Sequence, residues 1–204
     1  MADYKVAMIA RNIGSQVNGQ SYNKQIVVTE SDSFFDKLLE AAGDNASRPR
    51  RLTQLDIFAH CVGVVEGLAN VAADMDELFA KIFADGKISG TGWKAYGALI
   101  GSEFITSKTV KKFGDQSAIF ASNAEINFRV CMMARVSDDY TGKHGTYTGN
   151  GIKLCQAIAV MSGAYVRASA SPQGYVEEQN GAVRFVDWSP PVFQFSPDGG
   201  YWPE

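Results

Sequence analysis

Two residues of this chain, His60 and Cys131, combine a nucleophile with a base. A cysteine attacks as its thiolate, and a neighbouring imidazole can take the thiol proton and later pass it to the leaving group. His60 ends the segment Leu-Thr-Gln-Leu-Asp-Ile-Phe-Ala-His (52–60), and Cys131 follows Ala-Glu-Ile-Asn-Phe-Arg-Val (124–130). Both segments have the length and composition of strands, and open α/β sheets bind ligands at the carboxyl ends of their strands. Position alone also allows a plainer interpretation, in which Cys131 is a small core residue and His60 a structural one.

The rest of the chain alternates between strand and helix patterns. Strands are expected over 4–10, 25–29 and 165–168, helices over 34–42, 74–83, 102–113 and 152–161, a long loop over 137–151, a hairpin over 175–188 and an extended tail. The first helix is expected to take its N-cap from Ser31 or Asp32. This alternation predicts one α/β domain over 1–204 with three layers: a mostly parallel central sheet, helices on both faces and a C-terminal hairpin.

The composition is typical of a globular domain without a nucleic-acid or membrane partner. Apolar residues make up 46% of the chain, and the net charge of -3 leaves no basic stripe for phosphates. The first residues lack a charged leader and a long apolar stretch, so neither a signal peptide nor a transmembrane helix is expected. Three cysteines without disulfide or zinc spacing favour a reducing, cytoplasmic compartment. The absence of a GxGxxG or P-loop pattern predicts that no nucleotide cofactor is bound, and no metal site is expected.

The segments around His60 and Cys131 resemble the caspase-like cysteine peptidases, and are most similar to bacterial caspase-like domains of large surface proteins. Leu55-Asp-Ile-Phe-Ala-His60 is similar to the strand that ends in the catalytic histidine of that family. Glu125-Ile-Asn-Phe-Arg-Val-Cys131-Met-Met-Ala134 is similar to the strand that ends in its nucleophilic cysteine. The segments 151–159 and 162–169 resemble the helix and strand that follow. The resemblance covers Leu52 to Ser169, and the order of elements matches better than the residues do.

This resemblance implies a caspase-like fold and hydrolysis of peptide bonds in a peptide or protein substrate, without a cofactor. Cys131 would be the nucleophile and His60 the general base and then the acid. The backbone N–H groups of Cys61 and Cys131 would form the oxyanion hole. The segment after the fourth strand is where the family builds its substrate groove, so substrate-binding side chains are expected at Ser169, Ser171 and Gln173.

One departure from the family pattern supports a different function. The family usually has glycine after the catalytic histidine, whereas this chain has Cys61, whose side chain disfavours the backbone angles required there. The alternative is therefore an inactive caspase-like domain that acts as a binding or scaffolding module. A third possibility is another α/β hydrolase or transferase that uses Cys61 or His144. His144 lies in the expected loop over 137–151, the counterpart of the linker that many caspases cleave on activation.

Overall fold

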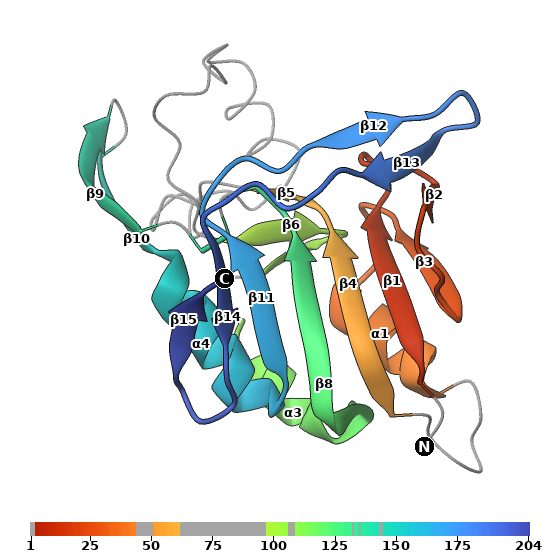
Figure 1. Ribbon diagram of the computed structural model, residues 1–204, viewed down its shortest axis with the longest axis horizontal. Coiled ribbons are helices and arrows are strands. Elements are labelled where there is room, and N and C mark those ends of the chain that lie inside the picture. Colours follow the sequence, from red (N-terminus) through yellow and green to blue (C-terminus); the bar gives the residue numbers. More distant parts are fainter. Residues whose placement is uncertain are drawn as a thin grey trace.

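A seven-stranded sheet forms the centre of the protein (Figure 1). The computed structural model describes residues 3–43, 51–61, 97–105, 109–131, 133–134, 136–142 and 145–204 of the 204-residue chain. The strands of this sheet are β1 (Lys5–Ala10), β3 (Lys24–Val28), β4 (Leu52–Phe58), β8 (Phe120–Arg129), β11 (Tyr165–Ser169), β14 (Val192–Phe195) and β15 (Tyr201–Pro203). They lie in the order β15-β14-β11-β8-β4-β1-β3, so the expected α/β character is confirmed.

The sheet is mixed, which corrects the expectation of a mostly parallel one. Strands β3, β1, β4, β8 and β11 pair in parallel, whereas β14 pairs antiparallel with both β11 and β15. The proline-containing tail, expected only to be extended, folds back through a turn in which Ser196 N–H donates to the carbonyl of Gly200 at 2.9 Å. A short turn is sufficient because antiparallel strands need no crossover helix.

In the described parts of the chain, three smaller sheets accompany the central one. Their strands are β2 (Gln16–Asn18), β5 (His60–Cys61), β6 (Ala98–Ile100), β7 (Glu103–Ile105), β9 (Val136–Gly142), β10 (Gly145–Asn150), β12 (Tyr175–Glu177) and β13 (Ala182–Phe185). The hairpin β12–β13 confirms the turn predicted at Asn180-Gly181, where Gly181 has φ +74°. The strands β9 and β10 pair over most of the segment expected to be a loop, which corrects that prediction.

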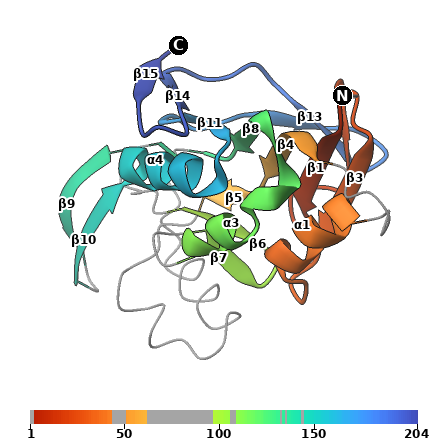
Figure 2. The ribbon, with the colours of Figure 1, turned by 90° about the horizontal axis from the view of Figure 1, so that it is seen from below.

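The described helices lie on one face of the sheet, not on both as expected (Figure 2). They are α1 (Phe34–Gly43), α3 (Lys111–Asp115) and α4 (Gly151–Ser162), with a 3-10 turn at Ser117–Ile119. The helix predicted over 152–161 is confirmed by α4. In the segment predicted as a helix over 102–113, residues 103–105 form β7 and the short α3 begins only at Lys111. The helix predicted over 74–83 lies outside the described residues.

The sequences of the central strands explain why the described helices cover only one face of the sheet. A parallel strand buried on both faces is apolar throughout, whereas these strands alternate. Leu55 and Ile57 of β4 are fully buried and alternate with Gln54 and Asp56. The same pattern recurs in β8 as Glu-Ile-Asn-Phe-Arg (125–129) and in β11 as Tyr-Val-Arg-Ala-Ser (165–169). Because side chains alternate between the two faces of a strand, the apolar set faces the helices and the polar set faces the other side.

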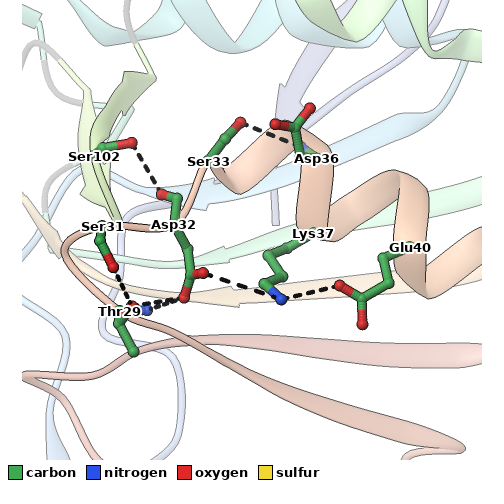
Figure 3. A network of polar contacts seen from close by, with 8 residues as sticks. All are labelled: Thr29, Ser31, Asp32, Ser33, Asp36, Lys37, Glu40 and Ser102. Carbon is green, nitrogen blue, oxygen red and sulfur yellow. Dashed lines mark hydrogen bonds and ion pairs between the residues drawn. The ribbon is translucent and has the colours of Figure 1, made fainter.

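The loop before α1 is held by polar contacts that also fix the helix start (Figure 3). Asp32 accepts hydrogen bonds from the backbone N–H of Thr29 at 2.8 Å and from its hydroxyl at 2.7 Å. The hydroxyl of Ser33 accepts from the N–H of Asp36 at 3.2 Å, so the cap of α1 is Ser33, one residue beyond the predicted candidates. Ser102 N–H donates to the carbonyl of Asp32 at 2.9 Å and joins this loop to the β6–β7 turn.

Gly101 in that turn leaves no room for a side chain. Its φ is +63°, and an added Cβ would lie 2.3 Å from the backbone oxygen of Asp32. We expect Gly101→Ala to lower the free energy of unfolding by about 2–4 kcal/mol, because both strain and a backbone clash arise. Gly163→Ala is the matched control: its φ is +69° but nothing lies within 4 Å of the new Cβ, so about 1 kcal/mol is expected. Urea unfolding measures both values, and equal losses would contradict the clash.

Candidate active site and adjoining pocket

The register of β4 and β8 brings the predicted catalytic residues to the same edge of the sheet. The two strands are parallel neighbours, as the proposed pair requires, and Phe58 lies opposite Arg129. His60 and Cys131 each follow that matched pair by two residues. At His60 the chain enters β5 and pairs with β6, His60 opposite Leu99. Both residues therefore leave the central sheet at the carboxyl ends of β4 and β8, the edge of the sheet over which the β12–β13 hairpin extends (Figure 1).

The Cys131 thiol is held by the backbone of Gln173. Its sulfur accepts a hydrogen bond from the N–H of Gln173 at 3.3 Å and donates one to the carbonyl oxygen of the same residue at 3.4 Å. Cys131 is half-buried. Its proximity contributes, after burial, to a raised pKa of Tyr175 in β12. The thiol thus faces the segment that joins β11 to β12.

The His60 imidazole is half-buried and in its neutral form near pH 7. Burial lowers its pKa, and a hydrogen bond with the backbone of Asn12 partly opposes that shift. A neutral imidazole can accept a proton, as a general base must. The described hydrogen-bond partner of the imidazole is the backbone of Asn12, and that of the thiol is the backbone of Gln173. None of these described contacts joins the His60 and Cys131 side chains directly.

The side chains predicted to bind substrate are engaged in holding the chain between β11 and β14. Ser169 is fully buried and its hydroxyl donates to the carbonyl of Ser189 at 2.5 Å. The hydroxyl of Ser171 donates to the carbonyl of Pro190 at 2.6 Å. The Gln173 amide accepts from Ser189 N–H at 3.2 Å and donates to the Ser189 carbonyl at 3.3 Å. Their role in substrate binding stays a prediction.

The remaining reactive residues differ in how far the structure describes them. Cys155 is fully buried, its pKa is raised by that burial, and its thiol donates to the Met133 carbonyl at 3.9 Å, so it belongs to the core. The backbone of Cys61 lies in β5 opposite Ala98, and its N–H stays a predicted oxyanion donor together with that of Cys131. His144 lies outside the described residues.

A buried polar cluster centred on Asp56 lies on the face of the sheet away from the helices. Asp56 is inaccessible to solvent and accepts hydrogen bonds from Tyr22 Oη at 2.7 Å and from Gln54 Nε2 and Asn127 Nδ2, both at 2.8 Å. Arg129 Nε forms an ion pair with its Oδ2 at 3.5 Å. Burial raises the pKa of Tyr22, and Asp56 raises it further, so this phenol stays a donor.

Aromatic rings cover the arginines beside that cluster. The guanidinium carbon of Arg129 lies 4.2 Å from the ring centre of Trp188 and 4.5 Å from that of Phe185. The guanidinium of Arg167 lies 4.9 Å from the Trp188 ring centre. Burial lowers the pKa of Arg129, whereas the carboxylate of Asp56 opposes that shift. Cation–π contacts of this kind fix the direction in which a guanidinium points.

An open pocket of about 380 Å³ lies against these arginines. Its lining comes from the loop after β2, from β8 and β11, and from the end of β13 and the residues that follow: Asn18, Gly19, Gln20, Arg129, Arg167, Arg184, Phe185, Val186, Asp187 and Trp188. None of the residues predicted from the sequence to be functional lines this pocket. The available signal was the polar residue at every second position of β4, β8 and β11, which indicates a sheet face that helices do not cover.

Comparisons with known proteins identify no relative. No family model, no curated protein and no solved structure matches this chain. None of the helices in the described parts of the chain is long and apolar enough to cross a membrane. The geometry of the site itself therefore carries the functional inference.

Proposed function

We propose that this protein is a cysteine endopeptidase in which Cys131 is the nucleophile and His60 the general base and acid. The observation that supports the proposal most directly is the parallel pairing of β4 with β8, in which Phe58 is matched with Arg129. His60 and Cys131 therefore each lie two residues beyond the same level of the sheet, where β4 and β8 end side by side. The resemblance to caspase-like peptidases, including their fold, belongs to this proposal.

The proposed reaction has two halves. His60 takes the proton of Cys131, and the thiolate attacks the peptide carbonyl carbon, whose oxygen becomes negatively charged and accepts hydrogen bonds from the N–H groups of Cys61 and Cys131. The C–N bond then breaks as the imidazolium of His60 protonates the leaving amine, which leaves a thioester on Cys131. Water, deprotonated by His60, attacks the thioester, and the thiol leaves with its proton restored.

Two contacts set requirements for this reaction. The Gln173 N–H points at the sulfur, the atom that bears the charge of a thiolate, whereas the Gln173 carbonyl accepts the thiol hydrogen. The second contact must break before the proton can pass to His60. A reducing compartment, which would keep Cys131 as a free thiol, is part of the same proposal.

A peptide carrying a thiol-reactive electrophile, such as a peptidyl chloromethyl ketone, tests the proposal in the full chain. We expect rapid labelling at Cys131, detected by mass spectrometry of the digested protein, because only an activated thiolate reacts quickly. Cys131→Ala should abolish it, whereas Cys155→Ala should leave it unchanged because Cys155 is buried in the core. Labelling at Cys61 instead would reject Cys131 as the nucleophile.

One observation favours the second candidate, a non-catalytic binding module. The described partners of the thiol and of the imidazole are the backbone groups of Gln173 and Asn12, respectively. If these contacts persist in solution, Cys131 should react with the peptide electrophile no faster than a free cysteine does. That result would reject the peptidase and leave the binding module.

A further inference from the structure

We propose that the pocket bounded by Arg129, Arg167 and Arg184 binds an oxyanion, the carboxylate or phosphoryl group of a ligand. The pocket is lined by Arg129 of β8 and Arg167 of β11, from the polar set of these strands, and by residues 184–188. The chain after β13 passes across the face of the sheet away from the described helices (Figures 1 and 2). Cys131 and His60 are not among its lining residues. The inference therefore holds whether or not the protein cleaves peptides.

The first support is the charge that lines the pocket. Three guanidinium groups come from three different strands, β8, β11 and β13, and one carboxylate, Asp187, lies among the lining residues. Each arginine has one carboxylate partner within the described parts of the chain: Asp56 for Arg129, Glu204 for Arg167 and Glu178 for Arg184. A guanidinium carries several N–H donors, so one partner leaves donors over for a second oxyanion.

The second support is a group of buried donors without an acceptor. The Nε atom of Arg167 and the Nε1 atom of Trp188 are inaccessible to solvent and have no hydrogen-bond partner in the described structure, whereas the equally buried Nε of Arg129 has the 3.5 Å ion pair with Asp56. All three residues line the pocket, and the Arg129 side chain is 8% exposed. Buried donors are normally paired, and leaving them unpaired costs free energy. A ligand with acceptor oxygens in the pocket would bring acceptors next to the side chains that carry these donors.

The third support is the rigidity of the arginines. Trp188 packs against the guanidinium groups of both Arg129 and Arg167, and Phe185 packs against Arg129 as well. Asp56 also forms an ion pair with Arg129, and three further side chains donate hydrogen bonds to its carboxylate. Side chains that are already fixed lose little conformational entropy on binding, so ordering them reduces the affinity for a ligand only slightly. The pocket is built to receive a planar or tetrahedral group of oxygens.

Calorimetric titration of the full chain tests the proposal with three probes: inorganic phosphate, succinate, and a blocked dipeptide with an aspartate side chain. The dipeptide with asparagine in its place is the neutral control. We expect at least one anion to bind with a Kd in the millimolar range or below, and the neutral dipeptide not to bind. Tight binding of free phosphate or succinate would identify a small molecule as the ligand. Binding of the aspartyl dipeptide alone would identify a peptide as the ligand.

Two arginine variants connect any binding to this pocket. Arg167→Gln and Arg184→Gln change partly exposed side chains, so the fold should survive, and each should weaken binding about tenfold because a charge-assisted hydrogen bond is lost. Arg51→Gln is the matched control, since Arg51 is an exposed arginine before β4 and outside the pocket lining. The proposal is overturned if no anion binds, or if both pocket variants bind as well as the control. Cys131→Ser must retain binding, which separates this result from any failure of the peptidase proposal.

Discussion

Replacing Asp56 by alanine is expected to lower the free energy of unfolding by about 3–5 kcal/mol, because the Arg129 guanidinium would remain buried without its counter-charge. The side chain of Arg129 is 8% exposed, so solvent cannot take over the lost contact. Tyr22 and Asn127 would also lose the acceptor of their buried hydrogen bonds. Guanidinium unfolding monitored by circular dichroism measures the change.

Two further variants separate the charge effect from a general effect of altering this face. Glu125→Ala removes an exposed carboxylate from β8 on the same face of the sheet and should change stability by no more than about 0.5 kcal/mol. Arg129→Met combined with Asp56→Ala removes both members of the ion pair, and should recover a large part of the loss. The loss in the free energy of unfolding of the double variant is compared with the sum of the losses of Asp56→Ala and Arg129→Met measured singly. If the two are equal, the ion pair itself contributes nothing to stability.

Replacing His60 by asparagine is expected to slow the labelling of Cys131 by a peptide electrophile by about 100-fold to 10,000-fold. This is the usual contribution of a positioned acid or base, and the variant removes it while leaving Cys131 in place. The only other histidine, His144, provides the control, and His144→Asn should react like the parent protein. The measurement is the second-order rate constant of labelling, followed by mass spectrometry.

The pH dependence of the same rate constant gives an independent readout. Burial lowers the pKa of His60, so its imidazole stays neutral and able to accept a proton below the ordinary histidine value of about 6.5. The rate of the parent protein should therefore be maintained from pH 7 down to about pH 6.5 and fall only at lower pH. In His60→Asn this acid limb should disappear. If both proteins lose reactivity over the same pH range, His60 is not the group that titrates.

Arg129 connects the two sites. It precedes Cys131 by two residues, pairs with Asp56, and lines the pocket through a guanidinium that packs against Phe185 and Trp188. Gln173 makes a second connection, since its backbone holds the thiol while its side chain holds Ser189, the residue after Trp188. A ligand in the pocket would therefore contact the same segments that surround Cys131.

The sequence by itself determined the elements whose signals are local. Strands β4, β8 and β11 and helix α4 follow from short apolar patterns, and the β12–β13 turn follows from Asn180-Gly181. These features depend on residues a few positions apart, which a single sequence displays directly. The same patterns placed His60 and Cys131 close to strand ends. The α1 cap at Ser33 was missed by one residue, because several neighbouring side chains can form such a cap.

Only the tertiary structure decided which strands pair and on which face of the sheet the described helices lie. The antiparallel pairing of β14 and β15 and the placement of the described helices on one face depend on contacts between distant segments, which periodicity does not specify. The pocket has the same origin. Tyr22, Asp56, Arg129, Arg167 and Trp188 lie far apart in the chain, and each alone has the sequence context of an ordinary surface or core residue. The sheet register and the chain after β13 bring them together. Charged groups that are buried on this face must be paired or hydrogen-bonded, and these residues are one another's partners.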